Sequence, residues 1–84
     1  MRYSVIVQRR AQKRIARFPT NVQYRIEASL QTLSDEPRPP GSRKLRGKDG
    51  WRIRVGDYWA IYETDDEARE VLILDIGHCR EVYR

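Results

Sequence analysis

Cysteine and long apolar runs are almost absent from this sequence, and each absence excludes a class of protein. The 84 residues include one cysteine, Cys79, so neither an internal disulfide nor a cysteine-based metal cluster can form. No stretch approaches the roughly 18–20 consecutive apolar residues of a membrane span. The apolar run near the N-terminus is too short for a signal peptide, and no small-residue cleavage site follows it. We therefore expect a cytoplasmic protein that does not act at a membrane.

Acidic residues are scarce in the first two thirds of the chain. Residues 1–54 carry 14 Lys and Arg against 4 Asp and Glu, a balance of +10, whereas residues 55–84 carry 3 against 8, a balance of −5. The basic part is a candidate electrostatic footprint for nucleic acid, and the acidic part is expected to lie elsewhere. Charge alone leaves a second interpretation open, in which the arginines only form the solvent-exposed surface of a helix.

The N-terminal half has the pattern of one strand and two helices. Residues 2–8 are β-rich and predict a strand. Residues 9–18 predict a very basic helix, because Ala11, Ile15 and Phe18 fall on one stripe.

A second helix is expected between two prolines. Pro19 ends the first helix, Thr20 followed by Gln23 fits a capping box, and Pro37 stops the second helix. The apolar stripe of this helix consists of Val22, Ile26, Leu30 and Leu33.

The C-terminal half predicts three strands. Residues 37–50 form a basic loop by composition, and residues 51–55 alternate strictly between apolar and basic side chains. Gly56-Asp57 is a natural hairpin turn into a strand at 58–64, and residues 71–76 are a nearly unbroken apolar strand that belongs inside a sheet. The expected fold is a single α+β domain (1–84) of order β-α-α-β-β-β. Its helical hairpin packs on one face of a small, mostly antiparallel four-stranded sheet.

Two helices leave the other face of such a sheet open. Arg52 and Arg54 belong to that face, because the alternating Ile53 and Val55 point to the core. If the next strand turns its aromatic tyrosines inward, Trp59 points outward beside the arginines. Arginines neutralise phosphates and an exposed ring stacks on an unpaired base, so this combination favours single-stranded RNA.

Four short motifs, taken together, resemble the RelE/ParE toxin superfamily, and its RelE branch in particular. They are LRG (45–47), WRIRVGDY (51–58), IYE (61–63) and GHxREVY (77–83), and the resemblance covers essentially the whole chain.

The resemblance implies the toxin of a type II toxin–antitoxin system. Toxins of the RelE type are ribosome-dependent endoribonucleases that cut mRNA in the A site and are neutralised by a cognate antitoxin. Operator DNA is then contacted only through the antitoxin complex. The family's chemistry needs no metal or other cofactor: the 2′-hydroxyl attacks the adjacent phosphate, basic residues stabilise the added charge, and a 5′-oxygen leaves.

The resemblance also assigns catalytic residues. Arg52 and Arg54 match the two basic residues of the family's first hairpin strand, Tyr83 matches its C-terminal tyrosine, and His78 lies where many relatives carry histidine or lysine. The proton carrier stays open between His78 and Tyr83, with Glu63 as a further alternative. Expected RNA-binding residues are Lys44, Arg46, Lys48, Trp59 and Arg80, with the basic side chains of the first helix.

Two departures from the family pattern leave other functions open. Trp59 stands where the family usually has arginine, and Cys79 stands where it often has a basic residue. One alternative is a poison of DNA gyrase like the ParE branch. Another is a catalytically weakened toxin that acts with its antitoxin as a DNA-binding co-repressor.

Overall fold

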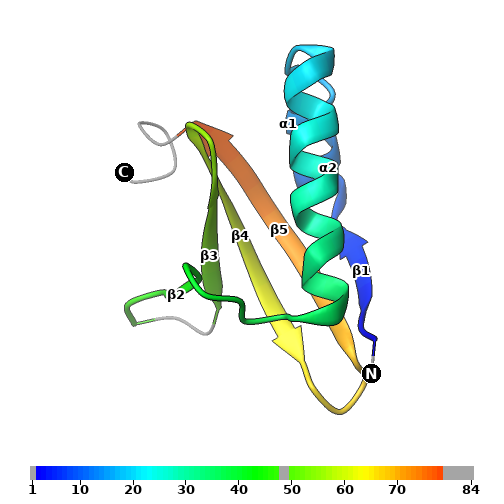
Figure 1. Cartoon of the computed structure of the whole chain (residues 1–84), viewed down its shortest axis with the longest axis vertical. Coiled ribbons are helices and arrows are strands. Elements are labelled where there is room, and N and C mark those ends of the chain that lie inside the picture. Colours follow the sequence, from blue (N-terminus) through cyan, green and yellow to red (C-terminus); the bar gives the residue numbers. More distant parts are fainter. Residues whose placement is uncertain (1, 48–49, 79–84) are drawn as a thin grey trace.

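The computed structural model describes residues 2–47 and 50–78. The predicted α+β class is confirmed, but the sheet has five strands instead of four. The additional strand arises because Arg43 and Lys44, inside the predicted loop, pair with Arg52 and Trp51 at the sheet edge. The elements are β1 (Ser4–Val7), α1 (Arg9–Ile15), α2 (Thr20–Asp35), β2 (Arg43–Lys44), β3 (Trp51–Val55), β4 (Tyr58–Asp65) and β5 (Glu70–His78) (Figure 1).

The sheet has the strand order β1-β5-β4-β3-β2. The pair β1 and β5 is parallel, and the other neighbours are antiparallel. The strand β5 has a partner on both sides, as its unbroken apolar run predicted.

One irregularity in β5 changes which way its last residues point. Ile73 pairs with Tyr62 and Asp75 pairs with Ile61, so Leu74 is an extra residue without a partner on β4. This bulge lets Ile73 and Ile76, three positions apart, both reach the core, whereas an unbroken strand would place them on opposite faces.

The hydrophobic core joins both helices to the sheet. The predicted stripe of α2 is confirmed, with Ile26, Leu30 and Leu33 buried and Val22 packed against them. The α1 stripe is confirmed as well, although α1 ends at Ile15 and Phe18 packs from the turn beyond it. The buried cluster consists of Ala11, Ile15, Ile26, Leu30, Leu33, Val55, Ala60, Tyr62, Val71, Ile73 and Ile76.

The start of α2 is built differently from the predicted capping box. The helix begins at Thr20 as expected, but Pro19 is its N-cap and no side chain caps it. The Pro19 carbonyl accepts hydrogen bonds from the backbone N–H groups of Val22 and Gln23, and the Gln23 amide reaches back to the Phe18 carbonyl. Thr20 therefore lies one position too late to act as the cap.

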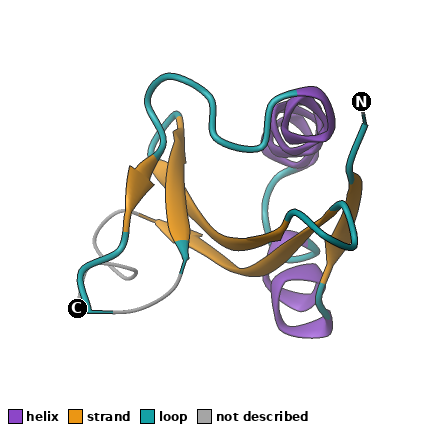
Figure 2. Cartoon of the chain, turned by 90° about the horizontal axis from the view of Figure 1, so that it is seen from below, coloured by secondary structure: helices purple, strands orange, loops and turns teal. Residues whose placement is uncertain are grey.

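The two helices lie at the β1 and β5 side of the sheet, and the β2 and β3 end projects away from them (Figures 1 and 2). Of the two, α1 contacts β5, while α2 contacts β1 and β3. In residues 2–47 and 50–78 we find no helix with both the length and the apolar character of a membrane span.

Candidate functional site

The hairpin of β3 and β4 places two arginines on the sheet face that points away from the core. Ile53 and Val55 pack with the core, so the intervening Arg52 and Arg54 project to the opposite face. Directly across the pairing, Arg52 lies opposite Ile61 and Arg54 lies opposite Trp59. The predicted common face of Arg52, Arg54 and Trp59 is confirmed.

Trp59 is not the exposed stacking platform that we expected. Its side chain is only 8% exposed. The guanidinium carbon of Arg52 lies 4.7 Å from the centroid of the Trp59 ring, and that of Arg54 lies 6.0 Å away. Because the ring attracts cations through its π face, the arginines lie over the surface that a base would need. The prediction was wrong because strand alternation gives the face of a side chain but not what covers it.

Arg54 is fixed by the turn that follows it. Its Nε donates a hydrogen bond of 2.7 Å to the carbonyl of Gly56, and its Nη2 lies 3.9 Å from the carboxylate of Asp57. The side chain remains 58% exposed. The guanidinium is therefore held at one edge and accessible to an anion at the other, which suits a phosphate oxygen.

His78 lies at the same end of the sheet but on its other face. It pairs with Tyr58, whose ring packs on Phe18 at 4.6 Å and contacts the His78 ring edge-on at 5.7 Å. Directly paired residues share a face, and Tyr58 faces the core. His78 therefore shares one end of the sheet with Arg52 and Arg54 but lies on the opposite face.

The remaining expected site residues fall into two groups. Lys44 and Arg46 are exposed, on β2 and just after it. Tyr83, Arg80 and Lys48 lie outside the described residues, and so does Cys79.

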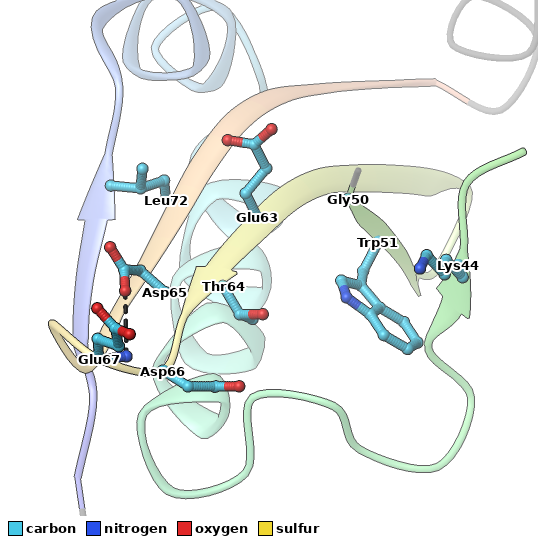
Figure 3. Close-up of a pocket in the computed structure, with 9 residues that line it drawn as sticks. All are labelled: Lys44, Gly50, Trp51, Glu63, Thr64, Asp65, Asp66, Glu67 and Leu72. Carbon is cyan, nitrogen blue, oxygen red and sulfur yellow. Dashed lines mark hydrogen bonds between the residues drawn. The ribbon is translucent and has the colours of Figure 1, made fainter. Parts of the chain in front are cut away.

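Most of the acidic residues of β4, β5 and the turn between them gather at the far end of β4. A pocket of about 500 Å³ is lined there by Glu63, by the turn between β4 and β5, and by Trp51 and Lys44 (Figure 3). Figure 3 shows Glu63 and Trp51 pointing to different sides of the sheet. The strand β4 thus runs from the arginine pair at its start to a cluster of carboxylates at its end, as the charge balance predicted.

A carboxylate on β5 forms ion pairs with basic residues of α1, which were not predicted from the sequence. Asp75 accepts from Arg14 Nε at 3.1 Å and lies 3.5 Å from Arg10 Nε, and it also accepts the N–H of Ile76 at 2.8 Å. The signal was present in the sequence, because a single carboxylate inside the run VLILDI requires a partner. Spacing alone could not say which of many arginines supplies it.

A second polar cluster ties the N-terminus to the turn between β4 and β5. The Tyr3 hydroxyl donates to Asp66 at 2.7 Å, and Arg38 donates to Asp66 and to Thr64. The hydrogen bond from Tyr3 and the nearby Arg38 guanidinium lower the pKa of Asp66, and the same hydrogen bond raises the pKa of Tyr3. Within the described ranges, no three carboxylate, histidine or cysteine side chains converge to hold a metal ion.

Comparison with known families decides what this arrangement belongs to. The family described as "ParE toxin of type II toxin-antitoxin system, parDE" matches residues 5–83. The chain belongs to the ParE toxin family. No match is found among curated protein sequences.

Solved structures similar to this ParE-family chain include RelE toxins, both free and in complex with an antitoxin. A Mycobacterium tuberculosis RelBE2 toxin–antitoxin complex matches with a TM-score of 0.85 and 26% identity, covering 93% of this chain and 92% of that one. A free Escherichia coli RelE mutant matches with a TM-score of 0.81 and 27% identity, covering 99% of this chain and 92% of that one. A Pyrococcus horikoshii RelE–RelB complex matches with a TM-score of 0.79 and 25% identity, covering 93% of this chain and 96% of that one. The predicted membership of the RelE/ParE superfamily is confirmed.

Proposed function

We propose that this toxin is a ribosome-dependent mRNA endoribonuclease that inhibits translation. The observation that carries the proposal is the pair Arg52 and Arg54, held on the open sheet face by the Trp59 ring and by the Gly56 carbonyl. The likeness to RelE toxins at 25–27% identity over nearly the whole chain supports the choice of RNA.

The arginines serve a cleavage in which the RNA supplies its own nucleophile. The 2′-hydroxyl loses its proton and attacks the adjacent phosphorus, the bond to the 5′-oxygen breaks, and that oxygen takes up a proton. Arginine stays charged at every relevant pH, so Arg52 and Arg54 stabilise the extra negative charge on the phosphate and transfer no protons. Proton transfer is assigned to Tyr83 and His78. Because His78 faces Tyr58, Tyr83 is the first to test.

The decisive experiment measures cleavage of mRNA on translating ribosomes by mapping new 5′ ends. Replacing Arg54 with alanine is expected to lower the maximal rate by about 10²–10³-fold, the usual effect of losing one fixed donor to a developing charge. Tyr83→Ala is expected to lower it as well. Arg69→Ala, in the turn between β4 and β5, removes the same charge far from the pair and serves as the control. Unchanged cleavage by Arg54→Ala would reject the site.

A second candidate function is a poison of DNA gyrase. The match of the ParE family over residues 5–83 favours it, as does the tryptophan at position 59. Purified toxin would then inhibit supercoiling by gyrase and leave ribosome-bound mRNA intact. The two assays run side by side separate the candidates.

Neutralisation by a cognate antitoxin is part of the proposal. Several similar structures are complexes of a RelE toxin with its antitoxin, which supports a partner of that kind here. Operator DNA would be contacted through that complex. Co-expression with the neighbouring small open reading frame, followed by co-purification, tests this partner.

A further inference from the structure

The helix α1 and the turn after it form a groove with only basic side chains in its lining. The groove has a volume of about 390 Å³. We call it the α1 groove, and its lining residues are Arg9, Arg10, Lys13, Arg14 and Arg17.

Only part of this positive charge is balanced. Asp75 holds Arg10 and Arg14 by their Nε atoms. Among the described residues, Arg9, Lys13 and Arg17 form no ion pair. Arg9 and Lys13 are four apart on α1 and Arg17 follows in the turn just after it, so three like charges line one groove and repel one another.

The placement of Arg9 adds a second cost. It lies in the first turn of α1, where the backbone N–H groups already present positive charge, and no acidic residue occupies that turn. A helix that served only to cover the sheet would be more stable with neutral or acidic residues here. Local rules broken in this way are expected where a surface serves a ligand.

The α1 groove borders the same sheet face as Arg52 and Arg54. Asp75 pairs with Ile61, and Ile61 pairs with Arg52, so these residues form one row across β5, β4 and β3. The row spans two strand spacings, about 10 Å. An RNA that reaches the arginine pair can therefore also reach the α1 groove.

We propose that the α1 groove is a second RNA-binding surface, which holds the phosphate backbone of folded, double-helical RNA and docks the toxin. The groove offers guanidinium and ammonium donors and, among its lining residues, no aromatic ring for a base. Donors of this kind read phosphates and not sequence. An acidic protein segment fits less well, because the centre of a protein interface is rich in aromatic and aliphatic residues, and only arginine and lysine line this groove. The choice of RNA rests on the proposed function.

The test is direct binding of a short RNA duplex across a salt series. Lys13→Gln/Arg17→Gln is expected to weaken binding roughly tenfold at about 0.1 M salt. It is also expected to reduce the slope of log affinity against log salt by about 2, since each phosphate contact contributes about 0.9. Arg2→Gln/Arg69→Gln removes the same charge elsewhere and is expected to lose less than about twofold, because charges beyond the Debye length are screened.

Three outcomes would overturn the proposal. One is equal loss in the two double variants. Another is weaker duplex binding with an unchanged slope against salt, which would show that Lys13 and Arg17 contact no phosphates. The third is unchanged RNA affinity together with lost binding of polyglutamate, which would assign the groove to an acidic protein. In the ribosome assay, the groove variant is expected to need more ribosomes for half-maximal cleavage and to keep the maximal rate. Failure of the proposed function would instead be seen with Arg54→Ala, while duplex binding stayed measurable.

Discussion

The indole of Trp59 supports the guanidinium of Arg52. Trp59 itself stands at a sequence position where the family usually has an arginine. The two groups are 4.7 Å apart and the ring is nearly buried. A desolvated cation–π contact of this kind contributes about 2 kcal/mol. We therefore expect Trp59 to act as a positioning residue, because its ring limits the rotamers of Arg52 and leaves fewer of them to be restricted when a phosphate binds.

Replacing the Trp59 ring tests that role. Trp59→Ala is expected to lower the maximal rate of mRNA cleavage about tenfold, since about 1.4 kcal/mol of alignment corresponds to that factor, and Trp59→Phe is expected to keep most of the rate. In an Arg52→Ala background, Trp59→Ala should have little further effect, because the pair acts as a unit. Full additivity of the two substitutions would show that Trp59 acts independently of Arg52.

Gly50 illustrates a residue constrained by both conformation and space. Its φ is +141°, and a Cβ there would lie 3.2 Å from Leu45 Cδ1 and 3.3 Å from the Tyr62 carbonyl oxygen. Gly50→Ala is expected to lower the free energy of unfolding in urea by about 2–3 kcal/mol, because such backbone conformations are costly for other residues. Gly47→Ala, with φ at +67° but open space around it, is the matched control and is expected to cost about 1 kcal/mol. Equal losses of unfolding free energy in the two variants would mean that the atoms around Gly50 move aside at no cost.

At the scale of elements, Asp66 links three segments that are distant in the sequence. It receives hydrogen bonds from Tyr3 before β1 and from Arg38 after α2, and it lies in the turn after β4. The pKa of Asp66 is lower in the folded protein than its ordinary value of 3.8, so its contribution is present above that pH and is lost as the pH falls through the folded value. The pKa of Tyr3 is raised above 10.0, so its contribution is lost as the pH rises through that higher value.

Thermal unfolding as a function of pH tests this contact. Asp66→Asn is expected to lower Tm at neutral pH, and the difference from wild type should shrink as the pH falls below 3.8. Asp65→Asn, at the neighbouring position, removes the same charge but leaves intact the hydrogen bonds that Asp66 accepts from Tyr3 and Arg38. It should therefore show a smaller change in Tm at neutral pH. A difference for Asp66→Asn that stays constant down to about pH 2 would contradict the assignment.

The elements also show why some of the site could be predicted and some could not. Strict alternation in residues 51–55 fixed the face of Arg52 and Arg54. The run VLILDI has no alternation, so nothing in it indicates the extra residue at Leu74. That bulge shifts the phase of β5 and turns His78 to the Tyr58 side. The face of His78 therefore depends on pairing with β4, which a single sequence does not contain.

At the scale of the whole molecule, the distribution of charge and the main strand pairing could be predicted, but the smallest strand could not. The separation of the basic and acidic parts follows from the order of residues, because β4 carries the chain from one end of the sheet to the other. The five-residue pairing of β3 and β4 follows from a short turn. The small strand β2 could not be predicted, since its Arg43 and Lys44 lack β-forming character and pair only because β3 presents a free edge.

The shared core predicts how the molecule unfolds. Leu33 on α2 and Ile73 on β5 are fully buried in the same cluster, so neither the helices nor the sheet keeps a core of its own. Urea unfolding followed by far-ultraviolet circular dichroism, which reports mainly on the helices, should therefore coincide with unfolding followed by tryptophan fluorescence from β3 and β4. Leu33→Ala is expected to shift both midpoints equally, with a loss of about 2–5 kcal/mol. Gln31→Ala, on the exposed side of α2, keeps the helix and should shift neither midpoint by much. Loss of the helical signal before the fluorescence change would mean that α1 and α2 separate from a sheet that is stable without them.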